Sequence, residues 1–311
     1  MKMGRSNLEV FADTLLELGG SNKDLLVVTG DSRGSGKLGP FGQKLPKQIV
    51  EIGIAEQNLV GVSAGLASTG KIVFTVSPAS FLTARSLEQI KNDVAYSDIP
   101  VKLIGISAGV SYGALGSTHH SLHDFAVLRA IYNITIMAPA DNFETEQAIL
   151  SAYEMDHPVY IRFGKQPMAH LHTETSDFRT GKAFRLAKGE DVLFIAAGET
   201  VFHALEAAKT LNESGWTSTV LSVFTIKPLD AETILAEARG NKVVITVEEH
   251  SVNGGLGEAV AGLLMQNNVS TPFRIVGIPD EYTVTGSQME IFEHYGISDF
   301  GLARTAVELL T

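Results

Sequence analysis

Two runs of the chain carry side chains that could move protons. The first is the run from Glu51 to Ala67, in which Glu56 falls where an extended apolar segment gives way to a helical pattern. The second is the glycine-rich run 107–124, which closes with three histidines. Carboxyl and imidazole groups are common general acids and bases in enzymes. Both runs are therefore candidates for proton chemistry.

Glu56 stands in the first turn of the predicted helix. A carboxylate there is stabilised by the helix dipole, so a purely structural role is one explanation of it. The same helix carries small residues on one side, at Gly61, Ala64, Gly65 and Ala67. Because small side chains let a second backbone approach closely, we expect this helix to pack deep in the molecule or at a subunit interface.

The three histidines, His119, His120 and His123, could also suggest a metal site. His119 and His123 are one helical turn apart, as in some zinc sites. However, the chain contains no cysteine, and no glutamate follows His119 directly, as a zinc-protease motif requires. We therefore expect no metal ligand in this chain.

The charge balance narrows the class of protein. The net charge is −11 without a basic cluster, which argues against binding to nucleic acid or to an anionic membrane surface. The absence of cysteine excludes disulfides and thiolate metal sites. No apolar run is long enough for a signal peptide or a membrane span, so we expect a cytoplasmic protein.

Apolar strands alternate with helical patterns along the chain, which predicts an α/β fold with parallel sheets covered on both faces. Ser6, and either Asp141 or Asn142, are expected to begin helices as caps. From Phe163 to about Thr180 the strand and helix patterns end, and glycine, proline and polar residues predominate, which is the composition of a linker. We therefore predict two domains, at 1–165 and 181–311, joined by a linker at 166–180.

Asp31 is a further candidate site residue. It follows the apolar strand 24–30 directly. Ligands in α/β folds bind at the carboxyl ends of parallel strands, so Asp31 is placed to contact a substrate. An aspartate that only caps a turn remains the alternative.

The string Ile-Gly-Ile-Ala-Glu-Gln around Glu56 resembles the thiamine-diphosphate motif of the transketolase and deoxyxylulose-phosphate synthase family. The resemblance implies that residues 1–165 form a pyrimidine-binding domain. It also implies that Glu56 hydrogen-bonds a ring nitrogen of the cofactor's aminopyrimidine and activates the cofactor by proton transfer. Phe81, with Phe74 behind it, matches the aromatic residues that stack on that ring; an ordinary core position is the alternative for both.

The run that ends in Thr118-His119 and continues as Asp-Phe-Ala-Val-Leu-Arg-Ala-Ile is similar to the family's substrate-histidine loop. By this comparison His119 acts on the substrate as a second catalytic residue. Arg162, at the end of a strand, matches an arginine that binds a sugar phosphate, and Arg5 is a second phosphate candidate. Surface ion pairs are the alternative for both arginines.

Two positions depart from the family pattern. Leu115 stands where the family commonly has an aspartate that contacts a hydroxyl of the acceptor sugar. An apolar side chain cannot make that hydrogen bond, so the usual hydroxyaldehyde acceptor is in question. Ser107 stands where many transketolases carry a further histidine. These departures point to an unusual donor or acceptor.

Two strings in the second half, 225–230 and 248–258, look like the transketolase C-terminal domain. That domain is chiefly structural in the family and does not hold the diphosphate. Gly254, Gly255 and Gly257, which precede a predicted helix, are therefore interpreted as close packing near a dimer interface.

A full transketolase carries a diphosphate-binding domain marked by Gly-Asp-Gly and a later Asn-Asn, and Gly30-Asp31-Ser32 is not that motif. The resemblance therefore implies the C-terminal subunit of a split transketolase. A separate N-terminal subunit would hold the diphosphate and Mg²⁺ of thiamine diphosphate in an α2β2 assembly. The pair would transfer a two-carbon ketol unit between a ketose phosphate and an aldehyde.

Two other functions remain open. The beta subunits of 2-oxo acid dehydrogenases have the same two-domain plan, although their loop usually reads Gln-His-Ser where this chain reads Thr-His-His-Ser. A non-catalytic regulatory subunit with the same fold is the second alternative. The presence of Glu56 and His119 argues against it.

Overall fold

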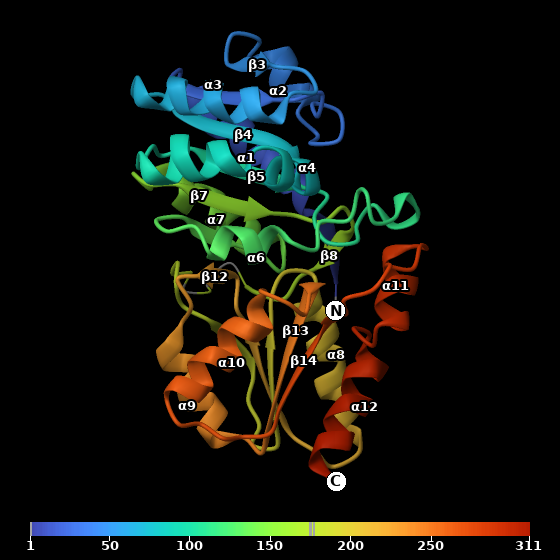
Figure 1. The fold of residues 1–311 in the computed structure, drawn as a ribbon. Helices are drawn as coiled ribbons and strands as arrows, with labels where there is room; N and C mark the ends of the chain where they lie inside the picture. Colours follow the sequence, from blue (N-terminus) through green and yellow to red (C-terminus); the bar gives the residue numbers. More distant parts are fainter. Residues whose placement is uncertain (1, 174–175, 177) are drawn as a thin grey trace. The chain divides into compact units, whose positions relative to one another are not determined.

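The computed structural model describes residues 2–173, 176 and 178–311 (Figure 1). The chain forms two compact units, of which the first is Met1–Ala108 with Val127–Ser176 and the second is Gly109–Ala126 with Asp177–Thr311. The predicted boundaries 1–165, 166–180 and 181–311 stay predictions, and positions 174–175 and 177 of that linker lie outside the described residues. The division adds one feature that the sequence pattern did not suggest: the run 109–126 belongs to the second unit.

The first unit is built on a sheet of parallel strands, most of them rich in buried apolar residues. In spatial order the strands are β6 (Thr135–Met137), β7 (Val159–Arg162), β5 (Lys102–Ile106), β4 (Ile72–Pro78), β2 (Leu25–Thr29) and β3 (Ile49–Glu51). Because these strands run in one direction, their carboxyl ends meet at a single edge of the sheet.

Helices cover both faces of this sheet (Figure 1). One face carries α1 (Asn7–Ser21) and α7 (Asn142–Glu154), which pack side by side. The other carries α3 (Glu56–Ser68), α4 (Ala79–Arg85), α5 (Leu87–Gln89) and η1 (Ile90–Tyr96). The remaining elements of this unit are α2 (Gly39–Lys44) and an antiparallel pair of β1 (Met3–Ser6) with β8 (Pro167–Ala169), while α6 (Asp124–Arg129) begins in the second unit and ends in the first.

The helix starts confirm two predicted caps. The Ser6 hydroxyl accepts a hydrogen bond from the backbone N–H of Glu9, whose carboxylate accepts one back from Ser6. The Asp141 carboxylate accepts from the backbone N–H of Glu144 and caps α7. Each cap satisfies N–H groups that a helix leaves without a partner in its first turn.

The second unit repeats the α/β plan. Its sheet has the order β14 (Phe273–Ile278), β13 (Val243–Ser251), β10 (Val192–Ala196), β11 (Ser218–Ser222) and β9 (Phe184–Ala187), with β9 antiparallel to β11. Helices α8 (Thr200–Glu213) and α12 (Asp299–Leu310) lie on one face, and α9 (Ala231–Gly240) and α10 (Leu256–Gln266) on the other (Figure 1). The unit also contains η2 (Gly113–Leu115), β12 (Thr225–Lys227) and α11 (Gln288–His294). The predicted α/β fold with parallel sheets is confirmed.

Among the described residues, the longest helices are too short or too polar to cross a lipid bilayer.

Candidate active site

Glu56 begins α3 at the edge where the parallel strands end. After β3 the chain passes Gly53 in a left-handed conformation (φ 82°) and enters the helix at Glu56. The Glu56 side chain is only 5% exposed, and both of its carboxylate oxygens lie 3.0 Å from Nη1 of Arg85. The helix dipole and this guanidinium together offset the cost of burying a carboxylate.

Phe81 and Arg85 lie four residues apart on α4, on one face of the helix. The guanidinium carbon of Arg85 lies 4.3 Å from the centroid of the Phe81 ring, the geometry of a cation–π contact. Phe81 itself is half-buried. The structure therefore brings Glu56 and Phe81 together through Arg85.

Arg85 belongs to the candidate site by its contacts, and the sequence analysis missed it. The signal was available, because a carboxylate predicted to be buried needs a counter-ion and because Arg85 follows Phe81 by one helical turn. The sequence does not show that Arg85 pairs with Glu56, because the two residues are 29 positions apart.

Asp31 and Phe74 occupy different environments at the sheet. Asp31 follows β2 with an exposed side chain, and its backbone N–H donates to the carboxylate of Glu51 at 2.6 Å. Its φ is 51°, in the left-handed region that non-glycine residues seldom enter. Phe74 is fully buried in β4, beside Val27 of β2 and Lys102 of β5 in the strand register.

Ser107, at the end of β5, is a second non-glycine residue in the left-handed region, with φ 54°. It is completely buried. Unusual backbone conformations cluster at functional sites, where the surrounding fold maintains them. With Asp31 after β2 and Ser107 after β5, the strand-end edge carries two of them.

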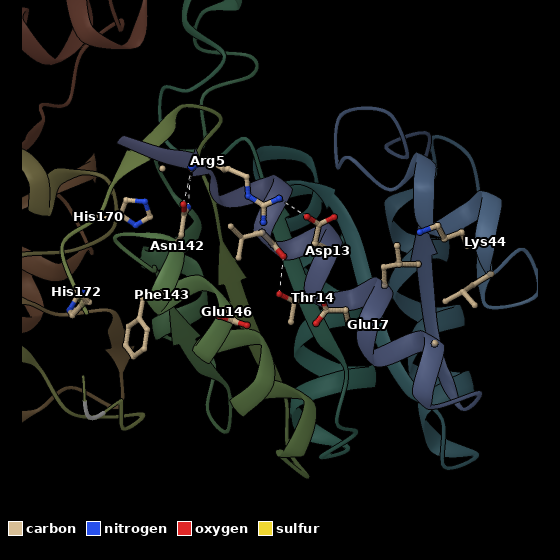
Figure 2. A pocket seen from close by; sticks show the side chains of 15 residues that line it. Arg5, Asp13, Thr14, Glu17, Lys44, Asn142, Phe143, Glu146, His170 and His172 are labelled. Atoms are coloured by element: carbon tan, nitrogen blue, oxygen red, sulfur yellow. Dashed lines mark hydrogen bonds and ion pairs between the residues drawn. The ribbon is translucent and has the colours of Figure 1, made fainter. Parts of the chain in front are cut away.

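The two predicted phosphate-binding arginines are in different places. Arg162 ends β7 at the same sheet edge and is 7% exposed. Arg5 lies on β1 and lines a surface cavity of about 780 Å³ (Figure 2). Its guanidinium forms an ion pair with Asp13 at 2.5 Å, with both side chains more than half exposed. An exposed pair of this kind contributes little stability, and Asp13 competes with a phosphate for Arg5.

His119 lies in the part of the chain that belongs to the second unit. Its Nδ1 is 3.0 Å from the Thr118 hydroxyl, and the Tyr112 ring meets its imidazole edge-on at 5.3 Å between centroids. Leu115, in η2, is 55% exposed. The described residues include no group of three or more histidine, aspartate or glutamate side chains arranged to hold a metal ion.

His120 has a different environment from its neighbour. It is 4% exposed, and its Nε2 lies 2.9 Å from the carbonyl oxygen of Gly113. Burial lowers the pKa of His120 below its ordinary value of 6.5, against the hydrogen bond to Gly113. A neutral His120 thus donates to Gly113 and closes the turn from which His119 projects.

The strand-end edge of the first unit fits the aminopyrimidine of thiamine diphosphate. The buried Glu56 carboxylate retains lone pairs beyond those that face Arg85, so it has acceptor capacity for a ring nitrogen. Phe81 offers a half-buried aromatic ring beside that carboxylate. A flat heterocycle with hydrogen-bonding nitrogens can use both features, by stacking and by hydrogen bonding.

The chain matches two known domain families. Residues 4–169 match the family description "Transketolase, pyrimidine binding domain", and residues 181–300 match "Transketolase, C-terminal domain". The chain belongs to the transketolase family.

Two relatives and one solved structure cover nearly the whole chain. A subunit of apulose-4-phosphate transketolase from Phocaeicola vulgatus is 50% identical over 302 residues, 96% of each chain. The protein of the same name from Actinobacillus succinogenes is 39% identical over 92% of each chain. A split-gene transketolase, solved as an inactive β4 tetramer, is 34% identical and superposes with a TM-score of 0.89 over 99% of this chain and 98% of its own. The chain is thus similar to subunits of divided transketolases.

Proposed function

We propose that this chain is the C-terminal subunit of a split, thiamine-diphosphate-dependent transketolase. The observation that carries the proposal is the 50% identity to an apulose-4-phosphate transketolase subunit over 96% of both chains. The reaction is transfer of a two-carbon ketol unit from a ketose phosphate to an aldehyde. The identity to two transketolase subunits favours this hypothesis over a 2-oxo acid dehydrogenase subunit.

In this proposal Glu56 holds a ring nitrogen of the aminopyrimidine and moves the proton that activates the cofactor. Bound thiamine diphosphate supplies the carbanion chemistry of the transfer. Arg85 keeps the Glu56 carboxylate in place, and Phe81 stacks on the ring. Glu56 is suited to this role because it is buried at a helix N-terminus, where water is excluded from the proton transfer.

His119 acts on the substrate in the same proposal, as a hydrogen-bond donor or proton carrier near neutral pH. Arg162 binds the substrate phosphate, since a buried guanidinium at a strand end can contact phosphate through two parallel hydrogen bonds. Asp31, at the same sheet edge, contacts the sugar, and Arg5 is a second phosphate contact. Support for these roles comes from the family resemblance and from the shared sheet edge of Asp31 and Arg162.

A separate N-terminal subunit completes the enzyme. We infer that it holds the diphosphate and the Mg²⁺ ion, and that the two chains assemble as α2β2. The similar split-gene transketolase is inactive as a β4 tetramer, which supports the need for a second kind of chain. A cytoplasmic location is part of the proposal, because phosphorylated sugars are charged and do not cross membranes freely.

Apulose 4-phosphate is the first donor to test, because two relatives of this chain are named for its transketolase. Leu115 bears on the acceptor. It is exposed on η2, so an acceptor that approaches there meets an apolar side chain rather than a carboxylate. We propose that the acceptor lacks a hydroxyl at that point or that its hydroxyl binds elsewhere.

Reconstitution tests the proposal. The purified chain is mixed with its N-terminal partner subunit, thiamine diphosphate and Mg²⁺, and ketol transfer from apulose 4-phosphate and from xylulose 5-phosphate is measured. Activity is expected in the mixture and not in either chain alone. Absence of transfer from both donors, with the cofactor demonstrably bound to the complex, would contradict the proposal; reduction of a lipoyl domain with a 2-oxo acid would then favour the dehydrogenase alternative.

A further inference from the structure

The histidine loop, defined as residues Gly109–Ala126, is attached to the end of a strand far away in the sequence. Its first half is held by Glu249, whose carboxylate accepts a hydrogen bond of 2.8 Å from the Val110 backbone N–H. Its second half is held by Ser251, whose backbone N–H donates a hydrogen bond of 3.1 Å to the Leu122 carbonyl oxygen of the loop. Both contacts come from the last residues of β13, in the second unit.

Glu249 is the centre of this attachment. It is 4% exposed, and the oxygen that accepts from Val110 also accepts from Nε2 of Gln288 at 2.8 Å. Gln288, also 4% exposed, donates to the carboxylate of Glu199 at 2.6 Å. One buried carboxylate therefore joins the loop to the start of α11, with neutral amide groups as its donors.

Glycine at position 109 is required for this contact. Gly109 has φ 60°, and a Cβ built there would lie 2.2 Å from Cδ of Glu249. A side chain at 109 and the Glu249 carboxylate cannot occupy the same space. The loop backbone is thus shaped to receive Glu249, which is evidence of a specific contact rather than incidental packing.

The tip of the loop, which carries His119, rests on the segment just before Gln288. Gly113 has φ 49°, and a Cβ there would lie 2.5 Å from the Gly286 carbonyl oxygen. The Ser117 hydroxyl lies 3.4 Å from the hydroxyl of Thr283. Glu249 thus binds the base of the loop directly. Through Gln288 it also binds the start of α11, which follows the segment that the loop tip contacts.

We propose that Glu249 is a positioning residue for His119 and that the C-terminal domain, through Glu249 and Gln288, sets the substrate end of the reaction. This inference rests on the proposed function, in which His119 acts on the substrate. It gives the C-terminal domain a role in positioning His119 beyond the structural one expected from the family. Glu249 does not act on the reacting atoms; it fixes the backbone from which His119 projects.

Three variants separate positioning from general stability. Glu249→Ala removes the acceptor of Val110 and Gln288, whereas Glu249→Gln keeps an oxygen acceptor of the same length. Glu237→Ala is the matched control, because Glu237 is a 6% exposed glutamate of the same unit that pairs with Arg185 and Lys188 instead of the loop. If Glu249→Ala fails to fold, Gln288→Leu removes only the outer part of the attachment and takes its place.

The first measurement is amide hydrogen exchange of the chain alone, followed by mass spectrometry. We expect Glu249→Ala to speed exchange in peptides covering 110–120 by tenfold or more while β4 and β5 exchange as in the wild type. Glu249→Gln should restore most of the protection, and Glu237→Ala should leave these peptides unchanged. Wild-type protection of the loop in Glu249→Ala would overturn the proposal.

The second measurement uses the reconstituted complex with thiamine diphosphate and Mg²⁺. We expect Glu249→Ala to lower kcat/KM for ketol transfer on the order of 10²-fold, because misplacement of a catalytic group by about 1 Å has that effect. Exchange of the cofactor's acidic proton with deuterium, which needs no substrate, should stay at the wild-type rate. An equal loss in both assays, or unchanged transfer with a mobile loop, would overturn the proposal. If the wild-type complex shows no transfer, the proposed function fails, while hydrogen exchange still decides whether Glu249 holds the loop.

Discussion

Glu56 and His119, the two predicted catalytic residues, are held in place in opposite ways. Glu56 belongs to a strand–helix junction, and its partner Arg85 is 29 positions away in the same unit. The histidine loop belongs to the second unit, whereas the residues on either side of it in the sequence belong to the first. It is fixed by Glu249, which is 139 positions from Val110. Glu56 is thus positioned by the sheet of the first unit, in which its own sequence takes part, and His119 by a strand of the second unit that is distant in the sequence.

The chemistry of the two attachments differs as well. Glu56 is a buried charge paired with an opposite charge, so loss of Arg85 leaves a carboxylate without its counter-ion. Glu249 is a buried carboxylate held by a backbone N–H and a side-chain amide. The first arrangement sets the charge around a buried carboxylate, whereas the second fixes a backbone. Mutations should therefore separate the cofactor step from the substrate step.

The largest effect is expected for Glu56→Gln. The amide cannot exchange a proton as a carboxyl does, so ketol transfer by the reconstituted complex should fall on the order of 10³-fold. Deuterium exchange of the cofactor's acidic proton should fall with it, because both depend on the same proton transfer. Glu88→Gln, an exposed change on the neighbouring α5, is the control. Unchanged proton exchange in Glu56→Gln would remove Glu56 from its proposed role.

His119→Asn is expected to have the next largest effect, a loss on the order of 10²-fold in ketol transfer. Asparagine retains a hydrogen-bond donor but cannot carry a proton. Cofactor proton exchange should be spared, in contrast to Glu56→Gln, since the proposed role of His119 is on the substrate. His123→Asn in the same loop serves as the control. A parallel loss of proton exchange would mean that the two residues serve one step, and the distinction drawn between them would fail.

Arg85→Ala should reduce activity less, on the order of tenfold, because Glu56 keeps its place at the helix N-terminus. Both assays are expected to decline together, since Arg85 acts through Glu56 and Phe81. Arg85→Lys keeps the charge but not the planar stacking, so it should recover only part of the loss. Full activity of Arg85→Ala would show that the sheet edge alone orients Glu56.

Much of the first unit could be predicted from the sequence, because its signals are local. The alternation of strands and helices gave the α/β class, and hydroxyl or carboxylate caps at Ser6 and Asp141 marked two helix starts. Glu56 was recognisable from a motif of six consecutive residues. The strands and the helix caps are set by residues close in the chain, whereas Glu56 was recognised only through a family resemblance.

The attachment of the histidine loop could not be predicted in this way. The sequence placed this glycine-rich run inside the predicted domain 1–165, whereas Gly109 and Gly113 make close contacts with segments that are distant in the chain. A pairing such as Val110 with Glu249 depends on which surfaces the fold brings together. Hydrophobic periodicity and secondary-structure propensity are local signals and do not predict it. The same reason explains why Arg85 was missed as the partner of Glu56.

His172 provides the smallest expected effect, and it concerns stability rather than activity. Like Val110, it is tied to a distant carboxylate: its Nδ1 lies 3.2 Å from Asp141, and its Nε2 lies 3.3 Å from Glu144. Unlike the amide donors of Glu249, it titrates. Burial lowers the pKa of His172, but the hydrogen bond to Asp141 and the charges of Glu144 and Asp141 outweigh burial and raise it above 6.5.

Because the folded pKa is the higher one, this contact stabilises the protein fully below pH 6.5 and loses its effect as the pH rises through the folded pKa. We expect His172→Gln to lower the free energy of unfolding of the first unit by about 1–3 kcal/mol at about pH 6, and by less at about pH 9. Urea unfolding at both pH values measures this, with His170→Gln, an exposed neighbour, as the control (Figure 2). A difference between wild type and His172→Gln that stays constant over this range would mean that His172 contributes by packing on Phe143 rather than by its charge. A stability difference that shrinks as the pH rises would establish a second kind of long-range contact, one whose donor titrates. In the contact between the histidine loop and Glu249, by comparison, the donors are amides that do not titrate.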